Sequence, residues 1–254
     1  MDEPSIRVDM DGPVAIVRMA RGKANALDTG MCRDIAERLG QVERGGARAV
    51  VLTGHGSIFC AGVDLLRIRE GGPGYLDEFL PALSDAFLAV FNCTLPVVAA
   101  VNGHAIAGGC ILVSACDHRV MNADHGRIGV TELLVGVPFP VTALEILRFA
   151  AGTHRLTELI HFGQTYPAAD AMALGLIDEA VGERSVLPAS VEIARQFAAL
   201  PQESLRQTRS QIRSPVIENI ARQRGVDDAV GSIWRSPAAQ QAIQAYVERV
   251  LHRS

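Results

Sequence analysis

One stretch of the chain, residues 97–136, restricts the possible folds more than any other. It opens with the apolar run Val97–Val101, which is typical of a buried strand, and an Asn-Gly pair then marks a turn. The adjacent glycines Gly108 and Gly109 lead into the apolar segment Cys110–Cys116, which predicts a short buried helix. The first N–H groups of a helix lack internal partners and carry the positive end of its dipole, so they can stabilise an oxyanion. Glycines at such a place are also common where a helix only packs closely, and this interpretation stays open.

A carboxylate and a second glycine loop are the other chemically informative parts of the sequence. Glu132 lies between Gly129 and the apolar run Leu133–Val137, and its simplest role is a charge in the first turn of a short helix. Residues 59–64, FCAGVD, follow a predicted buried strand, as the paired glycines do. Acyl-transfer and enolate chemistry both need two N–H donors that converge on one carbonyl oxygen. The two loops could supply these donors, with Glu132 as a base.

Composition excludes several classes of protein. The 254 residues are 48% hydrophobic and 20% charged, which suffices for a large core, and the net charge of −4 argues against a nucleic-acid binder. No apolar run approaches the roughly 18 residues of a membrane span, and the start of the chain lacks the pattern of a secretory signal. Five cysteines without a CxxC pair indicate a reduced, cytoplasmic protein, and the 7 histidines show no metal-ligand spacing. We therefore expect no metal site, no nucleic-acid partner and no membrane segment.

Periodicity predicts an α/β architecture with a helical C-terminal part. The expected strands are two within 5–19 and one each at 47–54, 97–101 and 176–182. The expected helices are 30–43 with Asp28 or Thr29 as its cap, 76–90, 141–150, 153–163, 168–175, 187–200, 203–213 and 233–251. Residues 55–65 are expected to form a loop, and the glycine-rich residues 66–74 a mobile segment. We divide the chain into an α/β core, residues 1–190, and a C-terminal helical region, residues 191–254.

The last predicted helix carries an apolar stripe formed by Ala239, Ile243, Val247 and Val250. A stripe of this kind must be covered, either by the core of its own chain or by a neighbouring subunit. The sequence alone leaves both possibilities open.

Four motifs together resemble the crotonase superfamily, the enoyl-CoA hydratases and isomerases. They are KANAL (23–27), FCAGVDL (59–65), VNGHAIAGGC (101–110) followed by CDHRV (116–120), and IGVTELLVGV (128–137). The resemblance covers essentially the whole chain, with the motifs in order and at matching spacings. It implies a ββα superhelix core with a C-terminal helical trimerisation region, an acyl-CoA substrate, and a homotrimer or a dimer of trimers.

The resemblance also assigns roles to residues. The backbone N–H groups of Val63 and Gly108 would bind the thioester oxygen, and Glu132 would transfer the proton. Residues 23–27 and 61–65 would together hold the nucleotide end of CoA. The substrate-binding residues implied in this way are Lys23, Ala24, Asn25, Leu27, Ala61, Gly62, Asp64, Leu65, Gly109, Ile111 and Thr131.

Ile111 distinguishes between reactions within the superfamily. The hydratases carry one glutamate three residues after the oxyanion glycine, where this chain has Ile111, and a second one at the place of Glu132. This chain has an aliphatic residue at the first of these two positions and a glutamate at the second. That combination resembles the Δ3,Δ2-enoyl-CoA isomerases of the mitochondrial type, as does the C-terminal sequence YVERV (246–250). The resemblance therefore implies proton transfer from C2 to C4 of a 3-enoyl-CoA. Neither a metal nor a redox cofactor is expected, because CoA is part of the substrate.

Two other hypotheses remain. Hydration or hydrolysis would be favoured if a second carboxylate, from Asp64 or from residues 138–145, reached the place of Ile111. A non-catalytic acyl-CoA-binding subunit would keep the fold without the chemistry. Two smaller expectations concern single residues: Asp64 is expected to anchor its loop rather than act as a second acid, and Cys60 to pack in the core.

Overall fold

The computed structural model describes residues 4–251. Its strands are β1 (Ile6–Asp11), β2 (Val14–Met19), β3 (Ala49–Thr53), β4 (Ile58–Cys60), β5 (Val97–Val101), β6 (His104–Ile106), β7 (His118–Asn122), β8 (Ile128–Gly129) and β9 (Glu179–Val181). Its helices are α1 (Thr29–Arg44), α2 (Leu65–Phe91), α3 (Gly108–Ser114), α4 (Glu132–Val135), α5 (Val141–Ala151), α6 (Leu156–His161), α7 (Ala168–Ala173), α8 (Val186–Ala199), α9 (Gln202–Arg222), α10 (Arg224–Arg235) and α11 (Pro237–Leu251).

The strands form two sheets. The larger is six-stranded in the order β1-β2-β3-β5-β7-β9, and the smaller is three-stranded in the order β4-β6-β8. Only β1 and β2 pair in an antiparallel manner, because the tight turn at Asp11-Gly12 joins them directly; the other neighbours pair in parallel. The predicted α/β class is confirmed.

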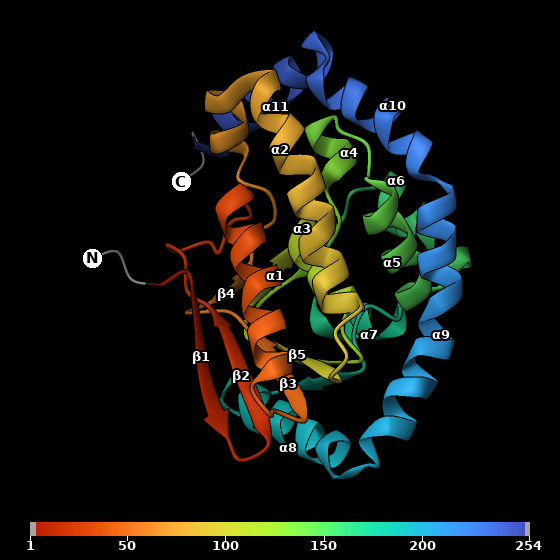
Figure 1. The fold of residues 1–254 in the computed structure, drawn as a ribbon. Helices are drawn as coiled ribbons and strands as arrows, with labels where there is room; N and C mark the ends of the chain where they lie inside the picture. Colours follow the sequence, from red (N-terminus) through yellow and green to blue (C-terminus); the bar gives the residue numbers. More distant parts are fainter. Residues whose placement is uncertain (1–3, 252–254) are drawn as a thin grey trace.

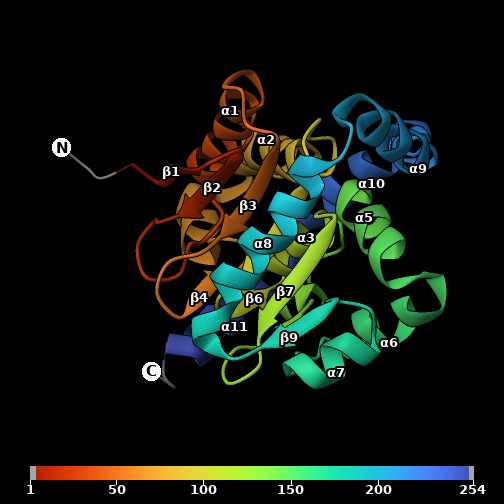
Figure 2. The same ribbon diagram turned by 90° about the horizontal axis from the view of Figure 1, so that it is seen from below.

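Helices cover both faces of the larger sheet (Figures 1 and 2). Val98 and Ala100 of β5 pack in one apolar cluster with residues of α8, such as Val191 and Ala194. Their neighbours Val97, Ala99 and Val101 belong to the main core, which α1, α2 and α3 complete. Since successive side chains of a strand alternate between faces, a strand buried on both sides must be apolar throughout, as β5 is.

Several predicted elements are confirmed almost to the residue. The side chain of Asp28 caps α1 by accepting a 2.7 Å hydrogen bond from the N–H of Met31. The apolar positions expected to face the core from α1, namely Met31, Ile35, Leu39 and Val42, are all buried. The central strand β5 and the short helix α3 lie where the glycine-rich stretch predicted them.

Three predictions of local structure are wrong. Residues 55–65 contain the short strand β4 rather than only a loop. Residues 66–74, expected to be mobile, belong to α2, because Asp64 caps the helix and Ile68 is buried; the helix is interrupted only at Gly72, whose φ of 62° needs a glycine. The predicted helix 233–251 is interrupted before Pro237: residues 233–235 are the end of α10, which begins at Arg224, and α11 begins at Pro237.

The apolar stripe of α11 packs on its own chain. Ala239, Ile243 and Val247 are buried in the main core, and α11 lies against α2 and α4. The side chain of Val250 lies outside the described residues. The stripe therefore gives no support for a contact between subunits. The proposed division at residues 190/191 falls inside α8, and it stays a prediction. Of the described helices, none is both long and apolar enough to cross a membrane.

Candidate active site

The two loops that were expected to act together are joined by backbone hydrogen bonds. Leu27 and Val63 form a parallel bridge: the N–H of Leu27 donates to Gly62 O at 2.8 Å, and the N–H of Asp64 donates to Leu27 O at 2.9 Å. The N–H of Ala61 donates to Ala24 O at 3.0 Å. Residues 23–27 and 61–65 thus form one continuous backbone surface, as the resemblance implied.

The side chain of Asn25 holds this surface in place. Its side chain is buried, its Nδ2 donates to the carbonyls of Ile58 and Phe59 at 3.1 Å each, and its Oδ1 accepts from the N–H of Arg21 at 2.9 Å. These contacts occupy both N–H donors of the amide group, so the side chain of Asn25 holds the conformation of the loop. Lys23, on the same loop, is exposed.

The glycine loops approach each other at Gly62 and Gly108. Gly62 has a φ of +86°, and a Cβ on it would lie 2.8 Å from Ile106 O and 3.4 Å from the nitrogen of Gly108. Only a glycine permits both this backbone angle and this approach. The N–H groups of Val63 and Gly108 therefore lie close together, and neither has a hydrogen-bond acceptor within residues 4–251.

A strained residue sets the direction of the first turn of α3. Ala107 has φ 52° and ψ −122°, and its N–H donates to Gly129 O at 2.8 Å. Within the described residues only Ala107 and Asn25 combine a positive φ with a side chain, and both lie in the glycine-loop region. Strain of this kind is concentrated at functional sites, where the surroundings enforce it. Sequence analysis missed Ala107, because alanine gives no signal for such a backbone angle.

The paired glycines also have the packing role that was left open. A Cβ on Gly109 would lie 2.2 Å from the carbonyl oxygen of Cys60, so α3 contacts β4 directly through its backbone. A Cβ on Gly108 would meet Leu27 Cδ1 at 2.9 Å and the ring of Phe87 at 3.4 Å. The two glycines thus let α3 pack closely and also begin a helix whose first N–H groups have no acceptor among the described residues.

Glu132 is the first residue of α4 and has a buried oxygen without a partner. Its Oε2 is enclosed and makes no hydrogen bond in the described part of the chain. Burial raises the pKa of this carboxyl group from 4.5 to about 7, although the backbone N–H groups of Glu132 and Thr131 act in the opposite direction. A carboxyl group of this kind can accept and return a proton near neutral pH.

The apolar residues that follow Glu132 in the sequence account for only part of its burial. Val135 is buried, but Leu133 and Leu134 are 44% and 53% exposed, and Leu134 packs against Gly163. The cover over α4 comes instead from other elements. A Cβ on Gly136 would lie 2.7 Å from that of Ala242 in α11, so the C-terminal helix closes over the segment that carries Glu132.

Strand pairing brings Glu132 to the start of α3. Ile106 of β6 pairs with Gly129 of β8, three residues before Glu132. Ala107, the N-cap of α3, also donates its N–H to Gly129 O at 2.8 Å, so the segment that leads to Glu132 lies beside the first turn of α3. The free N–H groups and the carboxyl group of Glu132 therefore belong to one region of the fold.

The carboxylates that could have favoured hydration are engaged in other contacts. Ile111 is completely buried and offers no acid. Asp64 caps α2 by accepting a 2.9 Å hydrogen bond from the N–H of Arg67, which confirms that it anchors its loop. Glu145, the carboxylate within residues 138–145, is bound by Asn219 at 2.7 Å and by Arg148 at 3.2 Å.

The remaining predicted residues have simple surroundings. Thr131 is buried next to Glu132, and Leu65 is half-buried against the core. Burial raises the pKa of the Cys60 thiol to about 12, which confirms its packing role. Among residues 4–251 no cluster of three or more His, Cys, Asp or Glu side chains could hold a metal ion.

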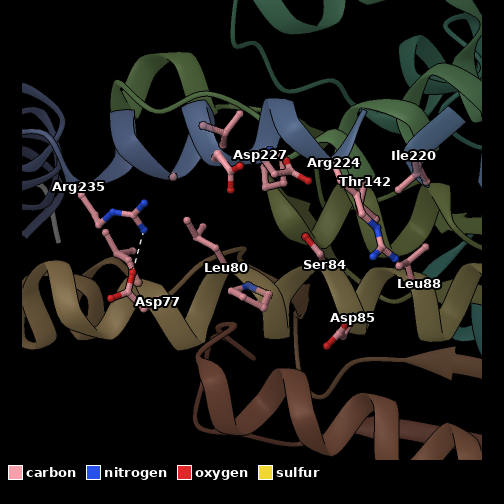
Figure 3. A pocket seen from close by; sticks show the side chains of 16 residues that line it. Asp77, Leu80, Ser84, Asp85, Leu88, Thr142, Ile220, Arg224, Asp227 and Arg235 are labelled. Atoms are coloured by element: carbon pink, nitrogen blue, oxygen red, sulfur yellow. Dashed lines mark hydrogen bonds and ion pairs between the residues drawn. The ribbon is translucent and has the colours of Figure 1, made fainter. Parts of the chain in front are cut away.

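A separate cavity of about 480 Å³ lies between α2 and α10 (Figure 3). Leu76 and Leu80 form part of its apolar wall, and a 2.9 Å ion pair between Asp77 and Arg235 spans it. Val63, Gly108 and Glu132 do not line this cavity, so it is distinct from the candidate active site.

The chain is similar to known proteins in sequence and in fold. The family model Enoyl-CoA hydratase/isomerase matches residues 9–252. Mitochondrial enoyl-CoA delta isomerase 1 of Mus musculus is 27% identical over 252 residues, 96% of this chain and 87% of its own length. The probable enoyl-CoA hydratase echA17 of Mycobacterium avium is 34% identical over 198 residues, 77% of this chain and 76% of its own length. The crystal structure of human mitochondrial delta3-delta2-enoyl-CoA isomerase has a TM-score of 0.94 at 24% identity, covering 99% of this chain and 100% of its own.

Proposed function

Because the chain belongs to the enoyl-CoA hydratase/isomerase family, we propose that it converts a 3-enoyl-CoA to a trans-2-enoyl-CoA. One observation carries this choice of reaction: Glu132 has a buried, unpartnered oxygen near the free N–H of Gly108, and the place expected for a second carboxylate is occupied by Ile111. One carboxylate can move one proton between two carbons. It cannot as readily hold a water molecule, deprotonate it and protonate a carbon.

The proposed mechanism uses a single base. The thioester oxygen accepts hydrogen bonds from the N–H groups of Val63 and Gly108. Glu132 takes a proton from C2, and the electron pair of the C–H bond moves into a dienolate whose oxygen carries the charge. Removing one such donor typically costs ~3–4 kcal/mol of transition-state stabilisation. Glu132 then returns the proton to C4, which leaves the double bond between C2 and C3.

The loops formed by residues 23–27 and 61–65 are proposed to bind the CoA moiety. Their hydrogen-bonded backbones form one surface, and the exposed Lys23 stands at its end, where its charge suits the phosphates of CoA. Side chains of Ala24, Ala61 and Leu65 would contribute apolar contacts. The proposed reaction uses neither a metal nor a redox cofactor, since the thioester itself makes C2 acidic.

Hydration of a 2-enoyl-CoA is the second candidate. The M. avium relative, which is named a probable hydratase, is more identical to this chain over its matched residues than the mouse isomerase is. The engagement of Asp64 and Glu145 in other contacts weighs against this reaction.

Parallel assays of the purified protein on 3-enoyl-CoA and 2-enoyl-CoA substrates test the choice. We expect isomerisation to exceed hydration by at least about a hundredfold, an estimate within the range for one missing acid–base group. The variant Ile111→Glu should gain measurable hydration while its isomerisation falls, because two carboxylates then share one buried site. Wild-type protein that hydrates as fast as it isomerises would contradict the proposal.

Assembly and location complete the proposal. We propose a homotrimer or a dimer of trimers, which rests on the family resemblance and not on the stripe of α11. Light scattering at micromolar concentration checks it, and a monomer would contradict it. A cytoplasmic location stays a prediction from the sequence, since the similar mouse isomerase is named as mitochondrial.

A further inference from the structure

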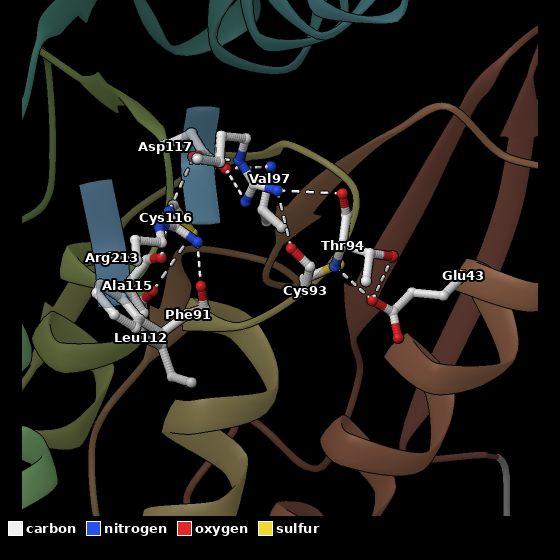
Figure 4. A network of polar contacts seen from close by, with 11 residues as sticks. Glu43, Phe91, Cys93, Thr94, Val97, Leu112, Ala115, Cys116, Asp117 and Arg213 are labelled. Atoms are coloured by element: carbon white, nitrogen blue, oxygen red, sulfur yellow. Dashed lines mark hydrogen bonds and ion pairs between the residues drawn. The ribbon is translucent and has the colours of Figure 1, made fainter. Parts of the chain in front are cut away.

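Two buried arginines of α9 surround the carboxylate of Asp117, at the end of α3 opposite Gly108 (Figure 4). Arg209 and Arg213 are only 8% and 7% exposed. The Nε and Nη2 of Arg209 and the Nη2 of Arg213 each donate to Asp117 at 2.8 Å. Two guanidinium groups share one carboxylate, so this cluster has a net positive charge.

The other partners of the two arginines are backbone carbonyls where helices end. Arg213 donates to Phe91 O, at the last residue of α2, and to Ala115 O, at the C-cap of α3. Arg209 donates to Cys93 O and Thr94 O, just after α2. Helix C-termini carry partial negative charge, so cations are favoured there.

Within residues 4–251, neither arginine forms a hydrogen bond or ion pair with a carboxylate other than Asp117. Glu43, another carboxylate of the network, accepts hydrogen bonds from the N–H and Oγ1 of Thr94 and not from an arginine. Burial raises the pKa of the Cys93 thiol to about 12 and that of Cys116 further still, so both thiols stay neutral.

Stability alone does not require this arrangement. Replacing a buried charged cluster by apolar side chains is often neutral or stabilising, because the desolvation of charges is costly. Apart from the two arginines, Ile220 is the only buried residue of α9. Apolar residues at positions 209 and 213 could attach α9 equally well, so attachment alone does not explain the two charges.

We propose that Arg209 and Arg213 are positioning residues for the oxyanion site, an inference that rests on the proposed function. They hold the C-terminal end of α3, and their net charge raises the electrostatic potential at the N–H of Gly108. The helix has 7 residues, so its ends are about 10 Å apart. Each residue of α3 is buried, so little solvent lies between the charge and the site to screen the interaction.

The first test is a set of variants on one helix. Arg213→Met should lower kcat about tenfold and change KM less than about twofold, since the charge acts on the transition state rather than on CoA binding. Arg209→Met, which also leaves a cluster of zero net charge, should give a similar loss and serves if Arg213→Met folds poorly. Arg213→Lys should restore most of kcat, because it keeps the charge. Arg206→Met is the matched control: Arg206 lies on the same helix but is exposed, and its removal should leave kcat unchanged.

The second test measures how strongly the oxyanion site binds a negative charge, without turnover. A 3-oxoacyl-CoA binds such a site as its enolate, which is followed by absorbance, whereas a saturated acyl-CoA binds without that charge. Arg213→Met should weaken binding of the enolate about tenfold and leave the saturated ester unaffected. Equal weakening of both esters, or a failure of Arg213→Lys to restore kcat, would assign the arginines a structural role only. Wild-type protein that binds neither ester would contradict the proposed function instead.

Discussion

The carboxylates at the two ends of α3, Asp117 and Glu132, have opposite surroundings. At the C-terminal end, Asp117 accepts hydrogen bonds from two arginines and from the N–H of Val97 at 2.7 Å. Near the N-terminal end, the Oε2 of Glu132 is buried with no partner, and its burial raises the pKa to about 7. One helix of 7 residues thus lies between a carboxylate whose two oxygens are both bound and one whose Oε2 has no partner within residues 4–251.

The difference distinguishes a carboxylate with a structural role from one that is suited to accept a proton. A carboxylate whose lone pairs are all occupied is a poor base, because it must give up hydrogen bonds to accept a proton. An unsatisfied, desolvated carboxylate costs folding free energy, but it is ready to accept a proton near neutral pH. The following predictions test whether this contrast holds.

The largest expected effect is the loss of the base. Glu132→Gln should lower isomerisation by about a thousandfold, because the amide keeps the shape of the side chain but cannot accept the C2 proton. Acyl-CoA binding should change little, which titration calorimetry checks. Glu158→Gln, an exposed site on α6, is the control and should keep full activity. A Glu132→Gln variant with a tenth of the wild-type rate would remove Glu132 from the role of base.

At the other end of α3, Asp117→Ala should mainly affect stability. It leaves two buried guanidinium groups without their carboxylate, and breaking a buried pair in this way costs ~3–5 kcal/mol. Asp178→Ala is the comparison, since Asp178 pairs with Arg119 at 2.7 Å but is 32% exposed, and its loss should cost about 1 kcal/mol. Urea denaturation measures both. Similar losses would show that the Asp117 cluster behaves as an ordinary surface pair.

The architecture of this site was largely predictable from sequence. Val97–Val101 and the paired glycines gave the strand and the helix because both are continuous, buried elements with distinct patterns. The side-by-side position of residues 23–27 and 61–65 came from the resemblance alone. Its basis, the bridge between Leu27 and Val63, is a contact between distant segments that no local pattern encodes.

Other features could not be predicted because they depend on tertiary packing. The positive φ of Ala107 is imposed by the neighbouring strands. Leu133 and Leu134 follow Glu132 directly in the sequence but are exposed, because consecutive residues of a helix point to different sides. The arginine cluster was missed for a similar reason: Asp117 and Arg213 are 96 residues apart.

The packing of α3 should tolerate an added methyl group at one of its paired glycines and not at the other. Gly109→Ala places a Cβ 2.2 Å from a backbone oxygen, so α3 must move away from β4 and carry the N–H of Gly108 with it. A shift of about 1 Å at a reacting group can cost around a hundredfold in rate, and we expect a loss of that size in kcat/KM. Gly108→Ala meets the end of the flexible Leu27 side chain at 2.9 Å and the ring of Phe87 only at 3.4 Å, with no backbone atom in the way, so it should lose markedly less. Equal losses would mean that packing against Cys60 does not position the helix.

The smallest predicted effect concerns stability at the active end of α3. The pKa of Glu132 is raised from 4.5 to about 7 in the folded protein, so the folded state binds this proton more tightly than the unfolded state does. Its contribution to stability is therefore fully present below about pH 4.5 and is lost as the pH rises through 7. Glu132→Gln removes the ionisation, so the stability of the variant relative to the wild type should rise by about 2.5 kcal/mol between pH 5 and pH 8.5. Thermal unfolding across this range measures the difference, and Glu158→Gln should show none. A Glu132→Gln variant whose advantage did not grow with pH would mean that the carboxylate is solvated, and the contrast between the two ends of α3 would then disappear.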